Sequence, residues 1–213
     1  MLVHGLGVTS RYWVRLRREL RGSTFAPDLP RGPLRVEELA AELRRRLDEA
    51  GIERAPFVAN SLGCQTATEL ALREPDRVES LVFIGPTGDP RARTRLHNLA
   101  RLVATSPFEQ PSLDVLVAYE YLASGPLRTF RQARALVRHP FVERLPKLRC
   151  PLLVIRGTHD AISPQAWAEE VVRRSGGAGV RVVPGGHAVH WSRPLLVARL
   201  VEEFQNGARE RDG

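Results

Sequence analysis

Short apolar runs alternate with amphipathic stretches along the chain. The apolar runs span residues 56–59, 81–84, 152–155 and 180–183, and the first three are almost continuously apolar. Unbroken apolar runs of this length are typical of parallel strands that are buried on both faces of a sheet. A shorter stretch at residues 24–26 is a further strand candidate.

Apolar residues at helical spacing fill the intervals between these runs. Gly51 and Pro75 follow two of the stretches and act as helix stops. Four helices are expected: residues 36–47, residues 67–71, a helix that opens with Ser163 as its N-cap and Pro164 as its first residue, and residues 195–204. Alternating strands and helices predict an α/β domain with a mostly parallel sheet flanked by helices.

Residues 87–148 interrupt this alternation. They contain no strand-like run, but they show helical patterns at residues 113–122 and 127–137. Open α/β sheets bind their ligands at the carboxyl ends of the strands. We therefore predict a core domain of residues 1–86 and 149–213, and a helical cap of residues 87–148 that lies over this edge of the sheet.

The tetrapeptide Asn60-Ser61-Leu62-Gly63 directly follows the run at residues 56–59. A strand that turns sharply into a helix at a serine matches the nucleophile elbow, G-x-S-x-G in pattern, with Ala59 in place of the first glycine. The strained turn exposes the serine hydroxyl, and small residues on either side let strand and helix pass closely. This pattern makes Ser61 a candidate nucleophile.

Asp160 and His187 each lie in a loop just beyond a predicted strand, and they follow Ser61 in chain order. Because the carboxyl ends of parallel strands meet at one edge of a sheet, we expect the three residues to converge there. His187 would take the proton of Ser61 during attack and return it to the leaving group. Asp160 would hold the imidazole in the required tautomer. The backbone N–H groups of Leu6 and Leu62 are the candidate oxyanion donors.

With these features the chain resembles the α/β-hydrolase superfamily. The motifs that carry the resemblance run nearly end to end in the family's order: Leu2-Val3-His4-Gly5-Leu6-Gly7, Pro27-Asp28-Leu29-Pro30, Asn60-Ser61-Leu62-Gly63, Gly157-Thr158-His159-Asp160 and Gly186-His187. The resemblance implies a carboxylesterase-like serine hydrolase whose cap shapes the substrate pocket. It would cleave a small ester or related carbonyl compound through an acyl-enzyme, with no organic cofactor and no metal.

The N-terminal part departs from the family pattern. Members usually carry two further strands before the His-Gly segment, whereas only Met1, Leu2 and Val3 precede His4 here. We expect either that the true start lies upstream of Met1 or that the chain is a shortened member with an exposed sheet edge. The family's Gly-x-Gly-x-Ser loop is also missing, since residues 31–33 read Arg-Gly-Pro.

Three alternatives remain open for the function. A carbon–carbon bond hydrolase of the meta-cleavage type would use the same three residues, and Asn60 and Trp191 recur in that subgroup. A cofactor-free perhydrolase would keep them as well. A catalytically silent binding protein of this fold is the alternative from another class, because the shortened strand and the missing loop both flank the oxyanion position.

Composition narrows the classes of partner. The formal net charge is +8, but the arginines are dispersed and no nucleic-acid-binding motif accompanies them. The two cysteines, Cys64 and Cys150, form no disulfide framework, and no signal peptide or membrane-length apolar run is present. We expect a cytoplasmic monomer or homodimer that binds a small-molecule substrate with an apolar acyl part, and no nucleic acid or membrane.

His187 and His190 have a spacing that metal ligands on a helix can show. They lie instead in a glycine-rich loop without a carboxylate nearby in the sequence, which argues against a metal site. We expect His190 to lie at the edge of the pocket or on the surface.

Overall fold

A five-stranded, all-parallel sheet forms the centre of the computed structural model, which describes residues 1–30, 32, 34–92, 94–125, 127, 131, 133 and 137–212. The strands lie side by side in chain order. They are β1 (Leu2–Val3), β2 (Ala55–Asn60), β3 (Val78–Ile84), β4 (Leu152–Gly157) and β5 (Gly179–Val183). The predicted fold class and its parallel sheet are confirmed, and the two-residue strand β1 forms one edge of the sheet.

The strand predicted at residues 24–26 is wrong, because none of these residues is in a strand. The carbonyl of Phe25 accepts a hydrogen bond from the Leu2 N–H at 2.9 Å. This contact does not continue into a ladder in the described part of the chain, so the segment runs alongside β1 without extending the sheet.

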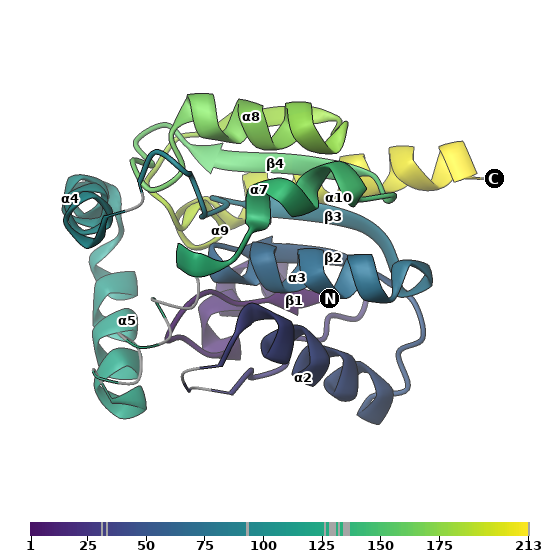
Figure 1. The fold of residues 1–213 in the computed structure, drawn as a ribbon, viewed down its shortest axis with the longest axis horizontal. Coiled ribbons are helices and arrows are strands. Elements are labelled where there is room, and N and C mark those ends of the chain that lie inside the picture. The colour runs from purple at the N-terminus through teal and green to yellow at the C-terminus, as the bar shows by residue number, and fades with distance from the viewer. Residues whose placement is uncertain are drawn as a thin grey trace.

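Helices cover both faces of the sheet (Figure 1). On one face lie α2 (Val36–Glu49), α3 (Leu62–Arg73), α7 (Phe141–Arg144) and α8 (Gln165–Ser175). On the other face lie α1 (Val14–Glu19), α9 (Val189–Ser192) and α10 (Pro194–Asp212). Short 3-10 helices at Ser10–Trp13, Pro75–Arg77, Ser106–Phe108 and Leu145–Lys147 complete the connections.

Successive side chains along each strand pack into two separate hydrophobic layers, one on each face of the sheet. In β2, Phe57 and Ala59 face the α2–α3 side, whereas Val58 faces α1 and α10. In β3, Phe83 faces the α2–α3 side and Ile84 faces α1 and α10. All of these side chains are 2% exposed or less. Burial on both faces explains why the strands are nearly continuous apolar runs in the sequence.

One predicted helix start is displaced by a residue. Helix α8 begins at Gln165 with Pro164 as its N-cap, not with Ser163 as the cap. The N–H of Ser163 donates to Asp160 Oδ1 at 2.9 Å, and its carbonyl accepts from Arg156 Nε at 2.9 Å. These two hydrogen bonds, made with side chains three and seven residues earlier in the chain, hold Ser163 outside the helix.

The insertion contributes α4 (Arg95–Thr105) and α5 (Pro111–Ser124), which lie beyond the end of the sheet toward which the β4 arrow points (Figure 1). The helix predicted at residues 127–137 falls largely outside the described residues. Near the end of the insertion, Phe141 and Leu145 are buried in the core on the α3 side. The division into core and cap domains stays a prediction.

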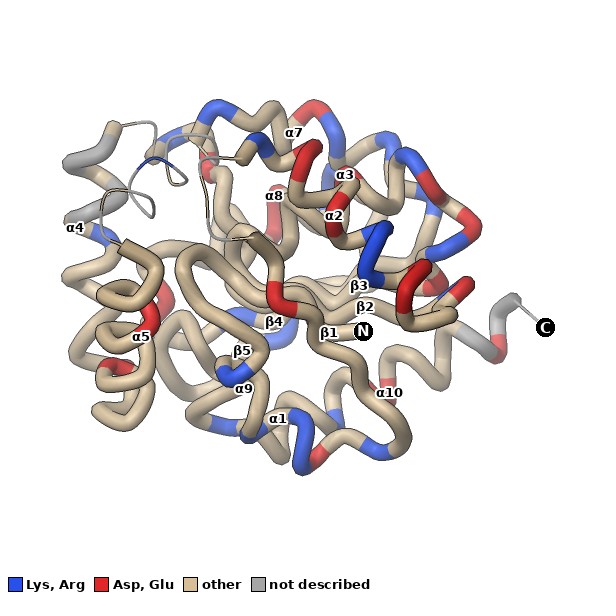
Figure 2. Tube along the Cα trace, turned by 90° about the horizontal axis from the view of Figure 1, so that it is seen from below, with Lys and Arg blue, Asp and Glu red and all other residues tan. Residues whose placement is uncertain are grey.

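Charged residues lie mainly on the outer helices, with both signs interspersed (Figure 2). On α2, Glu42 pairs with Arg45 and Arg46, and on α8 Glu170 pairs with Arg173 and Arg174. Many arginines therefore neutralise acidic neighbours on the same helix. No helix in the described part of the chain combines the length and apolar character needed to cross a membrane.

Candidate active site

Ser61 stands at the turn between β2 and α3, as the elbow pattern predicts. Its backbone has φ 55° and ψ −119°, and it is the one non-glycine residue with positive φ in the described part of the chain. This conformation brings Cβ close to the backbone and is strained for any residue but glycine. The Ser61 N–H donates to the carbonyl of Ile84 at 3.2 Å, and its side chain does not cap α3. The hydroxyl is thus held at the apex of the turn.

Small residues around Ser61 are required by close backbone contacts. A Cβ on Gly63 would lie 2.3 Å from the carbonyl oxygen of Val3, so only glycine lets α3 pass the end of β1. A Cβ on Gly5 would lie 3.2 Å from Cβ of Ser61. Ala59, two residues before the serine, is fully buried and fits without a glycine. The loop after β1 therefore runs directly beside Ser61.

Asp160 and His187 meet at the carboxyl ends of β4 and β5. The imidazole Nδ1 of His187 donates to Asp160 Oδ2 at 2.9 Å, and the carboxylate is 1% exposed. Because an ionised carboxylate only accepts, this bond places the proton on Nδ1 and leaves Nε2 as an acceptor in the neutral ring. Asp160 Oδ1 accepts from the Ser163 N–H, which fixes the carboxylate orientation.

Glycines let the two loops approach each other and the Ser61 turn. A Cβ on Gly157 would lie 1.8 Å from the carbonyl oxygen of Gly186. A Cβ on Gly85 would lie 2.6 Å from His187 Nδ1 and 2.9 Å from Asp160 Oδ2. Gly85 follows Ile84, whose carbonyl binds the Ser61 N–H. The Asp160–His187 pair therefore lies beside the strand end that supports Ser61.

The electrostatic setting of His187 favours its protonated form. Burial is the largest single influence and opposes the charge, but the Asp160 carboxylate and, to a smaller extent, Glu109 outweigh it. Together they raise the pKa of His187 above its usual value of 6.5. An imidazole of this kind is a stronger base toward a neighbouring hydroxyl.

The loop after β1 is held by the buried side chain of His4. His4 Nε2 accepts from the Leu29 N–H at 3.0 Å, so the ring is neutral and Nδ1–H donates to the carbonyl of Gly5 at 2.9 Å. The N–H groups of Leu6 and Leu62 have no acceptor among the described residues. Two free amides on the two segments that border Ser61 are suited to bind an anionic oxygen.

The sequence did not single out Glu109, which lies between α4 and α5. Its Oε1 accepts hydrogen bonds from the N–H groups of His187, at 2.5 Å, and Ala188, at 3.0 Å. This residue belongs to no motif, and its position depends on how the insertion packs against the core. Nothing in the local sequence pattern points to it.

The prediction for His190 is wrong, because this residue is fully buried. Its ring centroid lies 4.4 Å from those of both Tyr12 and Trp13. Burial, reinforced by the neighbouring His187, lowers its pKa to about 3. His190 is thus a neutral packing residue beneath the histidine loop.

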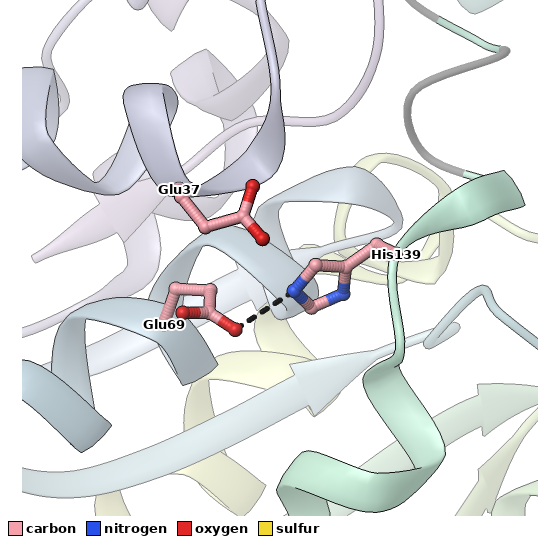
Figure 3. A group of neighbouring side chains, drawn as sticks. All are labelled: Glu37, Glu69 and His139. Atoms are coloured by element: carbon pink, nitrogen blue, oxygen red, sulfur yellow. Dashed lines mark hydrogen bonds and ion pairs between the residues drawn. The ribbon is translucent and has the colours of Figure 1, made fainter.

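Among the described residues, Glu37, Glu69 and His139 form the group that most resembles a metal-ligand set (Figure 3), with ligand atoms within 4.8 Å of one another. Glu69 Oε1 already contacts His139 Nε2 at 2.8 Å and Arg144 Nε at 2.9 Å, and Arg73 Nε lies 3.7 Å from Oε2. Two guanidinium groups supply the positive charge that a cation would bring. The cluster therefore fits an ion-pair network that links α7 to α3.

Comparison with a family model and with curated proteins gives matches over most of the chain. The model of the "Alpha/beta hydrolase family" matches residues 1–200. A protein of Shigella flexneri serotype X (strain 2002017) named "Putative carbamate hydrolase RutD" is 26% identical over 91% of this chain and 86% of its own length.

Solved structures share the fold at low sequence identity. The enol-lactonase from Burkholderia xenovorans LB400 has a TM-score of 0.73 and 24% identity, over 96% of this chain and 90% of that one. A thermophilic esterase from Thermogutta terrifontis has a TM-score of 0.76 and 24% identity, over 97% and 89%.

Proposed function

The chain belongs to the alpha/beta hydrolase family, and we propose that within it the protein is a serine hydrolase that acts through an acyl-enzyme. Family membership confirms the resemblance visible in the sequence. The names of the relatives, which include a carbamate hydrolase, an esterase and a lactonase, support its assignment as a hydrolase.

One observation carries the proposed mechanism. The hydrogen-bonded Asp160–His187 pair lies against Gly85, next to the residue whose carbonyl holds the strained Ser61 turn. A nucleophile, a base and an orienting carboxylate at one sheet edge are the parts that acyl transfer requires.

The chemistry follows from the tautomer of His187. Its Nε2 takes the proton of Ser61 as the hydroxyl oxygen attacks the substrate carbonyl. The negative oxygen of the tetrahedral intermediate accepts hydrogen bonds from the N–H groups of Leu6 and Leu62. His187 then gives the proton to the leaving group, and Asp160 stabilises the transient imidazolium. A water molecule, activated by the same histidine, releases the acyl group from Ser61.

The proposed substrate is a small ester or related carbonyl compound with an apolar acyl part. An apolar cluster of Val8, Tyr12, Leu113, Ala188 and Trp191 joins the loop after β1, helix α5 and the segment after His187. The cluster residues themselves are buried, but Leu116, Val117 and Tyr121 of α5 pack against them and are only partly buried, so they offer apolar surface on this side of the candidate site. This arrangement supports an apolar acyl group on the substrate.

Hydrolysis of a panel of carbonyl compounds tests the proposal. Aryl esters of increasing acyl length, an aryl carbamate and a meta-cleavage dienoate would be compared at equal concentration, with folded Ser61→Ala as the control. We expect ester turnover that depends on Ser61. Preferred cleavage of the carbamate or of the dienoate would move the assignment to that substrate class, and no turnover of any member would favour a binding protein.

A further inference from the structure

The stretch from the last residue of α4 to the first turn of α5 contacts both loops of the proposed catalytic pair. We call residues 105–112 the bridging segment. Thr105 Oγ1 accepts from the Ala161 N–H at 3.1 Å, next to Asp160. The Phe108 ring stacks on His159 at 3.9 Å with an interplanar angle of 8°. Both contacts fall on the loop that carries Asp160.

The bridging segment also forms hydrogen bonds with the loop that carries His187 and the helix that follows it. Glu109 Oε1 accepts from two successive N–H groups, those of His187 and Ala188. Trp191 Nε1 donates to Ser112 Oγ at 3.2 Å. The insertion thus contacts both members of the Asp160–His187 pair through their own loops, and Glu109 binds the backbone of the proposed base itself.

Glu109 can approach the backbone of the His187 loop because residue 186 is a glycine. A Cβ on Gly186 would lie 2.5 Å from Glu109 Oε1, so a side chain there would push the carboxylate away. The second oxygen, Oε2, is buried and has no hydrogen-bond partner among the described residues. Burying a carboxylate without a full set of partners is unfavourable, so its presence here indicates a role beyond stability.

We propose that Glu109 is a positioning residue for His187. Its Oε1 fixes the backbone of the histidine loop, and its negative charge supplements that of Asp160 in stabilising the imidazolium. The catalytic alignment then depends on the docked bridging segment, so the insertion completes the site as well as covering it. This inference rests on the proposed function, in which His187 is the base.

Two substitutions separate the hydrogen bonds from the charge. Glu109→Gln keeps an oxygen acceptor for both N–H groups but removes the charge, whereas Glu109→Ala removes both. Asp114→Asn, which removes an exposed carboxylate five residues after Glu109 in the sequence, is the matched control. Besides Glu109 and His187 themselves, the titratable groups that interact with one or the other are Asp160, His190 and Tyr12.

The first readout is the titration of the His187 imidazole, followed by NMR, which needs no turnover. We expect a lower pKa of His187 in Glu109→Gln than in the wild type, and an unchanged pKa in Asp114→Asn. The reason is that Glu109 contributes to the raised pKa of His187. An unchanged value in Glu109→Gln would overturn the electrostatic part of the proposal.

The second readout is ester turnover as a function of pH. We expect kcat to fall by roughly 10- to 100-fold in Glu109→Ala with little change in KM, because a misplaced base affects the chemical step. Glu109→Gln should recover most of this loss, with the acid limb of its profile shifted to lower pH. Equal losses in both variants with an unshifted limb would reduce Glu109 to a structural residue.

Failure of the inference is distinguishable from failure of the proposed function. If the wild type is active and the Glu109 variants show the same turnover and the same pKa of His187, the inference alone is contradicted. A wild type without Ser61-dependent turnover would contradict the proposed function, while the NMR titration would still decide whether Glu109 tunes His187.

Discussion

Replacing His190 with phenylalanine should make the fold less sensitive to acid. His190 packs between Tyr12 and Trp13, and burial lowers its pKa from 6.5 to about 3. In the unfolded chain this histidine takes up a proton below pH 6.5, whereas in the folded protein it stays neutral until the pH approaches 3. The folded state is therefore destabilised as the pH falls from 6.5 toward 3.

The size of the effect follows from the two pKa values. At pH 5 the unfolded state gains about 2 kcal/mol by protonating this histidine, while the folded state gains almost nothing. A change of this size shifts the midpoint of thermal unfolding by roughly 4–8 °C for a chain of this length. Between pH 8 and pH 5, we expect the free energy of unfolding to fall by about 2 kcal/mol less in His190→Phe than in the wild type.

Urea unfolding monitored by circular dichroism at pH 8 and pH 5 measures this difference. Any packing penalty of the phenylalanine is the same at both pH values and cancels from the comparison. His97→Gln, which replaces an exposed histidine on α4, serves as the control and should lose as much stability as the wild type. An equal loss of unfolding free energy in His190→Phe and in the wild type would show that the neutral, buried His190 does not limit acid stability.

Three further predictions concern the turn and the base. Ser61→Gly relieves the strain at φ 55° and should raise the free energy of unfolding by about 1 kcal/mol while abolishing turnover; an unchanged stability would argue against a strained turn. Gly63→Ala places a Cβ 2.3 Å from the Val3 carbonyl oxygen and should cost about 3 kcal/mol or more, whereas Gly207→Ala, in open space on α10, should gain up to about 1 kcal/mol in the same unfolding assay. Because His187 must be neutral to accept a proton, and its pKa is raised, the acid limb of kcat/KM should have its midpoint above pH 6.5; a midpoint below that value would contradict this assignment.

Local sequence patterns predicted the positions of the candidate site residues that lie at strand ends. The turn at Ser61 follows from the apolar run before it and the small residues around it. The order of Asp160 and His187 after two further strands predicted a shared edge, and the structure brings these two side chains within hydrogen-bonding distance. In a parallel sheet the strand ends alone place such residues together, so no tertiary detail is needed.

The sequence pattern does not predict the contacts made by the insertion or the packing of polar side chains in the core. Glu109 reaches the histidine loop only because the bridging segment docks on the core. The helix start expected at Ser163 moved because Asp160 and Arg156 bind its backbone. His190 is polar and sits in a glycine-rich stretch, yet Tyr12 and Trp13 enclose it from a distant part of the chain. For Glu109 and His190 the partners are distant in the chain, and for Ser163 they are nearby side chains whose orientation the sequence pattern does not give.

The role of Ser61 as the nucleophile can be measured by covalent labelling. The folded wild type would be treated with a fluorophosphonate, digested and analysed by mass spectrometry, beside folded Ser61→Ala and His187→Gln. We expect one phosphonylated residue, Ser61, with no labelling in Ser61→Ala and strongly slowed labelling in His187→Gln. A folded wild type that stays unlabelled, or that is labelled at another residue while Ser61 stays unmodified, would contradict this role of Ser61.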